Sequence, residues 1–492
     1  MNIFLIHSLA DILSPTKPLR SPDQMQFGIS YISSLLQKNG HATKLVVLSR
    51  LLGSRNFKIM DAQVKIFKPR LICFTSVYTE FSFINTIAKY LKKRYPDVFL
   101  LIGGPHASLN PDEVMACGNF DALCVGEGEY PTLEIVAQLE QNKQPSGIPN
   151  LWFKQANTIQ RNPPRPFLQD LDILPFPDRQ MWQEWTEEVA DAVHAVLLGR
   201  GCPFQCTYCC NLGLRKIAGG KYVRFRSPEN ILAEIKDFHA RYPQINNIYL
   251  EVETIGADKE WALRLCAKLR EFNTSLKQPL AYSTNLRIMP NMDLDSLFSA
   301  LKKSDFTMLK IGLESGSERV RREILKRDYS NTDIIKAVSL ARKYGLGVFF
   351  YNLVGIPGET LSDFKETIKV NRACLPDVSI PHVFFPYPGT ELYALCKERG
   401  LLPKILESGL ERSESVLDLP GFSKKQIQES YSWFDYDVYK GHKPMHKILA
   451  KVLVSKLISN AFLHAYYRRL TYLPVFKRVR FLISKSRRFK GD

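Results

Sequence analysis

Hydrophobic segments of strand length alternate with amphipathic helical segments along the first part of the chain. Apolar runs occur at residues 2–7, 43–48, 70–77, 98–104 and 122–129. The intervening segments carry apolar residues at helical spacing, as at residues 28–40 and 81–96. Alternation at this spacing predicts a parallel, doubly wound sheet with helices on both faces. We therefore predict an α/β, Rossmann-like domain over residues 1–141, with ligand-binding loops at the carboxyl ends of its strands.

A second series of alternating strands and helices begins at residue 193. Strand signals follow one another at residues 192–199, 247–252, 280–285, 306–313, 347–355 and 380–385. Ser227 and Pro228 are typical of a helix start, and a later helix is expected to be capped by Asn331 or Thr332. Six strands with intervening helices predict an incomplete parallel β/α barrel over residues 193–400. Active sites of such barrels lie at the carboxyl ends of the strands.

The two predicted domains are joined by residues 142–192, which are rich in proline. Proline removes a backbone donor and disfavours both helix interiors and central strands. We therefore predict a connector that contains at most a small hairpin. Residues 401–492 follow the barrel and are predicted to form a basic, helical region.

The composition excludes several classes of protein. A hydrophobic fraction of 45% and a charged fraction of 24% are ordinary for a soluble globular protein. The sequence contains no run of about 18 uncharged apolar residues, so no transmembrane helix is predicted. The first residues lack the basic region of a signal peptide and are typical of a first strand. The 10 cysteines are mostly scattered, so we expect a reducing, cytoplasmic compartment, where clustered thiols bind metal or do redox chemistry.

Three cysteines are clustered directly after the first predicted barrel strand. Their spacing is Cys202-x3-Cys206-x2-Cys209, with the aromatic Tyr208 before the last thiol. Three thiolates on one loop can hold three irons of a cubane cluster and leave the fourth iron open to a substrate. The alternative is a zinc site, which wants four protein ligands in paired spacings. No second pair follows, and Cys210 is expected to point elsewhere because it is adjacent to Cys209.

This cysteine segment resembles the radical S-adenosylmethionine (SAM) superfamily, whose hallmark is the same spacing with an aromatic before the last cysteine. In that family the open iron binds the amino and carboxylate groups of SAM. An electron from the reduced cluster then cleaves SAM to methionine and a 5′-deoxyadenosyl radical. The resemblance implies a [4Fe–4S] cluster on Cys202, Cys206 and Cys209. It also implies SAM as a cofactor and an external one-electron reductant of the flavodoxin or ferredoxin type.

Other strand ends offer groups that match the parts of SAM. An acidic residue after the second strand would hold the ammonium, and an arginine after the third could bind the carboxylate in two-pronged fashion. Glycines after the fifth strand would let backbone amides approach the adenine. The resemblance implies that the residues in contact with SAM are Glu253, Ser283, Asn285, Arg287, Glu314, Ser315, Gly316, Gly355, Pro357 and Gly358. The segment at residues 386–390, which closes the barrel, also resembles the family.

Segments of the first domain resemble the N-terminal domain of cobalamin-binding radical SAM proteins. They lie at residues 103–108 and 125–129, and the connector segment 171–179 also matches that subgroup. The Asp-x-His-x-x-Gly motif of cobalamin-dependent mutases is absent, since none of His7, His41 and His106 lies in it. The resemblance implies cobalamin bound without that histidine, with backbone contacts to its nucleotide tail from Gly103, Gly104, Gly126 and Gly128. The alternative is a Rossmann-like domain that binds nothing.

The subgroup includes C- and P-methyltransferases and the anaerobic cyclase of bacteriochlorophyll synthesis. The resemblance therefore implies methyl transfer to an unactivated carbon of a small-molecule or lipid-like substrate, with SAM used both as radical source and as methyl donor to cobalamin. Two alternatives stay open. One is radical oxidation, cyclisation or rearrangement without net methylation, and the other is a non-catalytic iron–sulfur sensor or binding protein. No residue is assigned as a general acid or base.

The positive charge of the chain is concentrated at its end. Residues 441–492 contain 13 Lys plus Arg and one acidic residue, which gives +12 of the total +18. An amphipathic helix is expected over residues 446–469, with one apolar side and lysines beside it: Ile448, Leu449, Val452, Leu453, Lys447 and Lys451. Bases interleaved with large apolar residues favour peripheral contact with an anionic membrane surface. A solvated face packed on the barrel is the alternative, and nucleic acid is disfavoured because no recognised module accompanies the patch.

Overall fold

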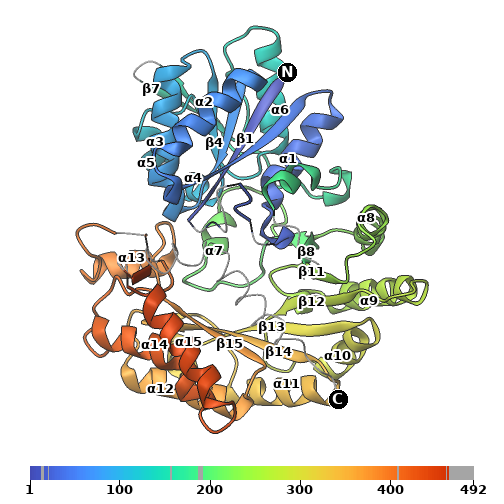
Figure 1. The fold of residues 1–492 in the computed structure, drawn as a ribbon, viewed down its shortest axis with the longest axis vertical. Helices are drawn as coiled ribbons and strands as arrows, with labels where there is room; N and C mark the ends of the chain where they lie inside the picture. The colour runs from blue at the N-terminus through green and yellow to red at the C-terminus, as the bar shows by residue number, and fades with distance from the viewer. Residues whose placement is uncertain are drawn as a thin grey trace.

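The structure is a computed structural model. It describes residues 1–464 apart from residues 11, 13–15, 20, 156–157, 187–191, 407–408, 410 and 461–462. Two large sheets lie one above the other in Figure 1, the first in blue at the top and the second in green to orange below. The short helix α7 (Cys210–Leu214) lies between them.

The first sheet has the strand order β2-β1-β3-β4-β5-β6-β7. Its first five strands in sequence pair in parallel, as predicted. They are β1 (Asn2–Leu9), β2 (Ala42–Ser49), β3 (Leu71–Thr75), β4 (Phe99–Gly103) and β5 (Ala122–Cys124). β5 is shorter than the apolar run suggested, because the chain turns at Gly126 with a φ of 86° and Gly128 precedes the next helix.

Helices cover both faces of this sheet. Along β1 the side chains alternate, so that Ile3 and Leu5 enter one buried cluster while Phe4 and Ile6 enter the other. α1 (Phe27–Lys38) and α6 (Glu129–Glu140) pack in the first cluster. The second cluster lies under the remaining helices, namely α2 (Arg55–Phe67), α3 (Tyr78–Arg94), α4 (Pro105–Leu109) and α5 (Pro111–Ala116). The doubly wound α/β arrangement is thus confirmed.

The proline-rich segment extends the first sheet. β6 (Leu151–Gln155) and β7 (Thr158–Arg161) form an antiparallel hairpin that pairs with β5. Farther along the segment, Arg179 pairs with Glu234 of the next domain at 2.5 Å. This segment therefore belongs structurally to both neighbours and holds them together.

The second sheet is a six-stranded parallel array in the order β15-β14-β13-β12-β11-β8. Its strands are β8 (Val193–Leu197), β11 (Asn247–Glu251), β12 (Ala281–Leu286), β13 (Phe306–Glu314), β14 (Gly347–Val354) and β15 (Val378–Val383). All six predicted strands are present, and β8 and β15 are not paired with each other, so the barrel is incomplete as predicted. The helices that pack outside it are α8 (Pro228–Arg241), α9 (Lys259–Thr274), α10 (Leu294–Lys303), α11 (Asn331–Lys343) and α12 (Leu361–Cys374).

The helix caps show one success and one error of the sequence analysis. Ser227 caps α8 as predicted, since its side chain accepts a hydrogen bond from Asn230 N at 3.0 Å. The predicted cap of α11 was wrong by one residue. Ser330 is the cap. Its side chain accepts a hydrogen bond from the backbone amide of Asp333, and the Asp333 side chain accepts one from the backbone amide of Ser330, which is a capping box.

The chain after the barrel forms three further helices, α13 (Glu391–Glu398), α14 (Lys424–Tyr439) and α15 (Met445–Ile458). α14 packs between α12 and α15 around a buried cluster that includes Phe434 and Ile448. The predicted apolar side of α15 is divided: Ile448 and Val452 are 2% and 4% exposed, whereas Leu449 and Leu453 are 45% and 59% exposed. The remainder of the predicted helix lies largely outside the described residues. Among the described residues, no helix is long and apolar enough to cross a membrane.

Candidate functional site

The three clustered cysteines lie on a loop at the carboxyl edge of the second sheet. The loop follows β8 and the short strand β9 (Gly199–Arg200) and leads into α7. β9 pairs with β10 (Arg224–Phe225), and the pairing is so close that a Cβ at Gly201 would lie 2.2 Å from the Tyr222 carbonyl oxygen. Gly201 has a φ of 84°, so glycine is required on both counts. The glycines before Cys202 therefore fix where the loop leaves the sheet.

The middle of the loop is tied to a distant segment after β13. Thr207 Oγ1 donates to the carbonyl of Ile324 at 2.6 Å, and Thr207 O accepts from Leu392 N at 3.0 Å. Ile324 ends a π-helical turn over residues Val320–Ile324. Such turns are rare and occur often at functional sites. Here the turn brings its terminal carbonyl to the loop between Cys206 and Cys209.

Tyr208, the aromatic of the cysteine segment, belongs to a buried polar triad. Its hydroxyl donates to Glu314 Oε1 at 3.0 Å and accepts from Arg327 Nη1 at 2.8 Å. Arg327 pairs with Glu314 at 3.4 Å, and the arginine is only 5% exposed. Burial raises the pKa of Glu314, and the positive charge of Arg327 opposes this rise. The triad fixes the loop to β13 because each member is held by the other two.

Glu314 reaches this position through a distorted strand end. The pairing of β13 with β14 shifts between Gly312 and Glu314, and Glu314 has a left-handed φ of 59°. A Cβ at Gly312 would lie 2.4 Å from Glu314 Oε1. The carboxylate therefore folds back over a glycine that leaves room for it. A non-glycine residue in this conformation costs free energy and is typical of functional sites.

Two arginines converge on Cys206. Arg287 Nη1 lies 2.9 Å from Cys206 Sγ, and its guanidinium stacks on the ring of Phe204 at 3.7 Å. Arg327 Nη1 lies 4.0 Å from the same sulfur. The Nε atoms of both arginines are buried without a hydrogen-bond partner. Two positively charged groups therefore lie beside this one sulfur.

Cys209 lies beside a second polar group of residues. Asn211 Nδ2 lies 3.6 Å from Cys209 Sγ and donates to Glu253 Oε1 at 3.0 Å, while Tyr222 donates to Asn211 Oδ1 at 2.6 Å. A hydrogen bond from Cys210 is the largest cause that lowers the pKa of Cys209, to about 7. The expectation that Cys210 points elsewhere is therefore wrong. Its place at the start of α7 turns its thiol back toward Cys209.

The donor set fits an iron–sulfur cluster. All three thiols are free of disulfides, although burial raises the pKa of Cys202 to about 12, so metal binding would have to displace its proton. Within the described part of the chain, no three His, Cys, Asp or Glu side chains surround a single ion position. A tetrahedral zinc site would bring sulfurs within about 4 Å of one another, whereas a cubane takes each thiolate on a different iron. The loop thus offers the three thiols that a cubane cluster would need.

Some of the predicted SAM residues lie beside the cysteine loop, and others are engaged within the protein. Glu253, Arg287 and Glu314 lie against the cysteine loop, as described above. Asn285 lies on the same edge, but its side chain donates to Val252 O at 2.9 Å. Ser283 lies two residues before Asn285 on β12 and therefore farther from the carboxyl edge. Together these residues place acidic, basic and amide groups around the cysteines. The groups come from three neighbouring strands, so the parallel sheet itself assembles them.

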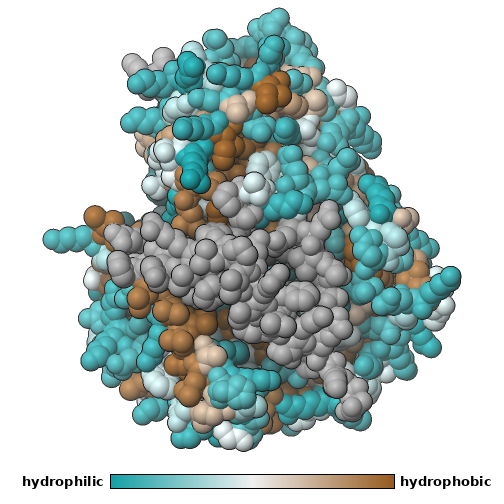
Figure 2. Space-filling view, in the orientation of Figure 1, coloured by the Kyte–Doolittle hydropathy of each residue, from teal (hydrophilic) through white to brown (hydrophobic). Residues whose placement is uncertain are grey.

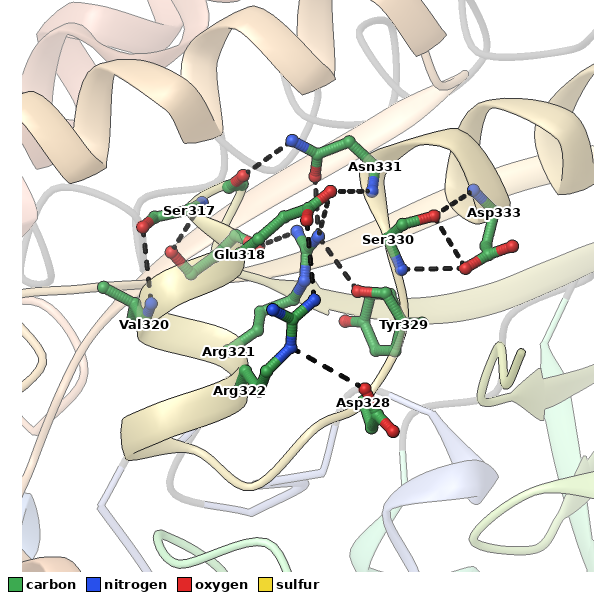
Figure 3. A network of polar contacts seen from close by, with 12 residues as sticks. Ser317, Glu318, Val320, Arg321, Arg322, Asp328, Tyr329, Ser330, Asn331 and Asp333 are labelled. Atoms are coloured by element: carbon green, nitrogen blue, oxygen red, sulfur yellow. Dashed lines mark hydrogen bonds and ion pairs between the residues drawn. The ribbon is translucent and has the colours of Figure 1, made fainter.

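Ser315 and Gly316 are instead engaged within the protein. Ser315 is fully buried, and its carbonyl accepts from Arg321 Nη1 at 2.6 Å. A Cβ at Gly316 would lie 2.4 Å from the Glu366 carbonyl oxygen. Figure 3 shows the surrounding network, in which Arg321 reaches back from the π-helical turn toward Tyr329 and Asn331. The network holds the end of β13 and the turn in one arrangement.

The loop after β14 contains a residue that the sequence analysis missed. Gly355 N donates to Glu359 Oε2 at 2.8 Å, and Glu359 Oε1 is buried without a partner. Burial is the main cause that raises the pKa of Glu359 to about 8. A Cβ at Gly355 would lie 2.9 Å from Ile427. Of the other predicted residues of this loop, Gly358 is exposed and Pro357 is buried. No sequence motif marks Glu359, because its burial depends on how this loop packs in the fold.

The glycines of the first sheet line its carboxyl edge in different ways. A Cβ at Gly104 would lie 2.8 Å from both N and O of Ser76, so this glycine allows two loops to pack closely. Gly103 and Gly128 also lie against protein atoms. Gly126 lines a small pocket together with Glu127, Tyr130, Asn150, Arg165 and Phe167. Among the predicted cobalamin glycines, Gly126 thus lines a pocket, whereas the Cβ position of Gly104 is filled by the Ser76 backbone.

A histidine packs at this edge, and an ion pair joins the edge to the barrel. His106 packs against Tyr78 and Phe81, and Tyr78 in turn lies 6.0 Å from the ring of Phe385. Burial lowers the pKa of His106 to about 4, so its imidazole is neutral. Arg200, beside the cysteine loop, pairs with Glu127 at 2.9 Å. The two carboxyl edges are thereby held facing each other.

Two family models match the chain. The model of the radical SAM superfamily matches residues 196–370, and the model of the B12 binding domain matches residues 21–136. A radical SAM domain implies a [4Fe–4S] cluster and SAM, and a B12-binding domain implies cobalamin. The first match contains the cysteine loop, and the second contains the glycine loops after β4 and β5.

Known proteins resemble most of the chain. It is 26% identical over 405 residues to an uncharacterized methyltransferase (PH0819) of Pyrococcus horikoshii, covering 82% of this chain and 85% of that protein. It is 21% identical over 471 residues to cytidylyl-2-hydroxyethylphosphonate methyltransferase of Streptomyces wedmorensis, covering 83% and 85%. The structure of the radical SAM methyltransferase TsrM of Kitasatospora setae, with tryptophan and a SAM analog bound, aligns at a TM-score of 0.67. Its identity is 13%, and the alignment covers 97% of this chain and 99% of that one. That likeness shows a shared fold.

Proposed function

Because this chain belongs to the radical SAM superfamily and carries a B12-binding domain, we propose that it is a cobalamin-dependent methyltransferase acting on an unactivated carbon. One observation carries this proposal. The cysteine loop, with its two arginines, lies on an edge that faces the glycine loops of the first sheet. The relatives described above as methyltransferases resemble the chain over most of its length, which supports methyl transfer as the reaction.

The cysteine loop would hold the cluster through Cys202, Cys206 and Cys209. A bound cluster supplies one electron for cleavage of SAM, and a bound cobalamin supplies the methyl group. Arg327 and Tyr208 keep the loop in place, since both are buried and bonded to Glu314. The loop is therefore pinned at its middle, between Cys206 and Cys209.

The residues beside the loop would hold SAM. Glu253 provides a carboxylate for the ammonium group and already accepts a hydrogen bond from Asn211. Arg287 provides a guanidinium for the carboxylate and has unsatisfied donor capacity at Nε. Asn285 offers its amide, and the exposed Gly358 offers its backbone. In the first domain, Gly126 would contact the cobalamin tail from the pocket that it lines.

Radical SAM enzymes require an external reductant and a substrate. We propose a small acidic reductant of the flavodoxin or ferredoxin type. Outside residues 441–492 the chain keeps a net charge of +6, and this favours an acidic partner because opposite charges accelerate the encounter of two proteins. Raising the salt concentration should then slow reduction by such a protein while leaving reduction by dithionite unchanged.

Products formed without any substrate test the reaction class. Anaerobically reconstituted protein with cobalamin, SAM and dithionite is expected to release both 5′-deoxyadenosine and S-adenosylhomocysteine. The second product reports methyl transfer from SAM to cobalamin. Release of 5′-deoxyadenosine alone would favour oxidation, cyclisation or rearrangement, and release of neither would favour a non-catalytic iron–sulfur protein. The Cys206→Ala variant is the control and should release no 5′-deoxyadenosine.

We further propose that the C-terminal region contacts an anionic membrane surface. On α15 the side chains of Met445, Leu449 and Leu453 are exposed at successive turns. Figure 2 shows apolar residues gathered on this side of the molecule, where Figure 1 places α14 and α15. The basic residues of 441–492 would each contribute about 1 kcal/mol at an anionic surface. This location would suit a lipid-like substrate.

Vesicle flotation tests the membrane contact. The wild-type protein should float with vesicles that contain anionic phospholipid and remain behind with neutral vesicles. The double variant Leu449→Glu and Leu453→Glu should lose most of this binding, because both side chains are exposed and their replacement leaves the core intact. Equal flotation of the variant and the wild type would refute the role of this face.

A further inference from the structure

The inner face of the second sheet carries polar side chains from several strands. Along β11, β13 and β14, alternate residues such as Leu250, Ile311 and Phe350 are buried against the outer helices. Their neighbours must therefore point to the opposite face. Those neighbours include Glu251 and Lys310, which are half-buried. The inner face thus places charged groups inside the barrel, below the cysteine loop.

Lys310 is the least satisfied of these groups. Its ammonium lies 3.5 Å from the centre of the Tyr249 ring. Among the described residues it makes no hydrogen bond and no ion pair, although an ammonium has three donors. Burial lowers the pKa of Lys310, and the carboxylates of Asp23 and Glu251 oppose this effect. A partly desolvated cation without an acceptor is costly unless a ligand provides one.

A carboxylate lies on the same level of the barrel. Leu250 pairs with Thr284 and Asn285 pairs with Lys310, so Glu251, Asn285 and Lys310 occupy one level on three adjacent strands. Two strand spacings separate the backbones of Glu251 and Lys310 by about 10 Å. Within the described part of the chain, the carboxylate of Glu251 makes no hydrogen bond and no ion pair. Each of the two charges acts on the pKa of the other, but the two side chains form no ion pair.

Aromatic rings form the adjoining wall. Phe349 lies on the level of Lys310, and its ring centre is 4.7 Å from that of Tyr351. Tyr351 stacks with His382 at 6.2 Å and an interplanar angle of 19°. Burial lowers the pKa of His382 to about 4, so the ring is neutral. The wall therefore presents flat, uncharged surfaces beside the ammonium of Lys310.

We propose that this inner face is the substrate-recognition site and that it selects a small molecule with an anionic group, either carboxylate or phosphate, on an aromatic or apolar body. Lys310 pairs with the anionic group. The rings of Tyr249 and Tyr351 contact the body, and Glu251 accepts a hydrogen bond from a hydroxyl or ammonium group at its other end. The identification of the bound molecule as substrate rests on the proposed function, whereas the binding itself does not.

Binding of three simple probes tests this inference. The probes are phenyl phosphate, 3-phenylpropionate and the neutral 3-phenylpropan-1-ol, measured by equilibrium dialysis against reconstituted holoprotein without reductant. Probes of about ten heavy atoms should bind in the millimolar range. At least one anion should bind about tenfold more tightly than the alcohol, which corresponds to about 1.4 kcal/mol. The tighter of the two anions distinguishes a phosphate from a carboxylate substrate.

Variants of Lys310 assign the effect to its charge. Lys310→Met should weaken binding of the preferred anion about tenfold and leave the alcohol unchanged, and Lys310→Arg should retain most of the affinity. Lys336→Met, which removes an exposed lysine of α11, is the matched control and should bind as the wild type does. Circular dichroism shows whether each variant is folded. If Lys310→Met fails to fold, the anion affinity of Lys310→Arg is compared with that of the wild type instead.

Several results would overturn the proposal. They are an alcohol that binds as tightly as both anions, undiminished anion binding by Lys310→Met, and no binding of either anion at about 10 mM, the upper end expected for such probes. The proposed function fails separately. Protein that binds the anions but releases neither 5′-deoxyadenosine nor S-adenosylhomocysteine would refute methyl transfer and leave the anion site in place.

Discussion

The carboxyl edges of the two sheets face each other but are built from different kinds of residues. The edge of the second sheet presents charged side chains, with Arg287 and Arg327 directed at Cys206. The edge of the first sheet presents glycine loops and a neutral histidine, His106. One edge therefore suits small charged groups that side chains recognise, and the other suits a large group held by shape and backbone. Changes at the second edge should alter chemistry, and changes at the first should alter packing.

The largest expected effect is on the cysteine loop. The Cys206→Ala variant should lose nearly all of its iron, because a cubane held by three thiolates cannot replace one of them from the protein. Iron and sulfide analysis after anaerobic purification checks this. Cys266→Ala, which removes a buried thiol of α9, should keep the iron. A Cys206→Ala protein that retains its full iron content would break the assignment of this edge.

The next effect should come from the buried triad. Arg327→Met removes the cation that Glu314 and Tyr208 need, and truncation of one partner of a buried ion pair costs about 3–5 kcal/mol. The free energy of unfolding from urea titration measures this loss, and the cluster should also be lost more readily on dilution. Arg319→Met breaks a surface pair with Asp363 and is the control, for which a loss below about 1 kcal/mol is expected. Equal losses for the two variants would contradict the role of the triad.

At the first edge, Gly104→Ala should destabilise the fold by about 3 kcal/mol. Gly104 has a φ of 99° and a ψ of 179°, a region that only glycine occupies readily, and its Cβ would meet the Ser76 backbone. Gly103→Ala is the matched control, because its Cβ would lie 3.6 Å from Cys124 in ordinary contact. Urea titration compares the two. A similar result for both variants would mean that the loops can separate without cost.

The smallest effect concerns the pH dependence of stability. Burial raises the pKa of Glu359 in the fold to about 8, above its ordinary value, so its contribution to stability is complete below the ordinary value and is lost as pH rises through about 8. The free energy of unfolding of the wild type should therefore fall between pH 5 and pH 8 relative to Glu359→Gln, by on the order of 2 kcal/mol. Parallel curves for the two proteins would show that Glu359 is ionised in the fold.

The sequence predicted the strands well because their signal is local. An apolar run marks each parallel strand of the two sheets, and the largest difference at a strand end is that of β5, which stops at Cys124 because Gly126 turns the chain early. The apolar side of α15 was predicted less well. Its residues have the right spacing, but burial of Ile448 and exposure of Leu449 depend on where α14 lies. Helix pattern alone does not contain that information.

The candidate site shows the same limit. The spacing of the cysteines and the order of polar strand ends were visible in the sequence. Arg327 was not, because no motif marks an arginine that follows a π-helical turn and reaches Cys206 from far along the chain. Ser315 was expected beside SAM; in the structure its side chain is fully buried, and Arg321, six residues along the chain, donates to its carbonyl. Contacts between strand ends and remote loops decide which of the predicted residues face the site.

The comparison of the two edges depends on both holding their cofactors at once. Metal analysis of the full-length protein, purified anaerobically from cells supplied with cobalamin, tests this most directly. The account predicts about four iron atoms and one cobalt atom per chain, with no stoichiometric zinc. Zinc in place of iron, or a full complement of iron with no cobalt bound under any loading condition, would contradict it.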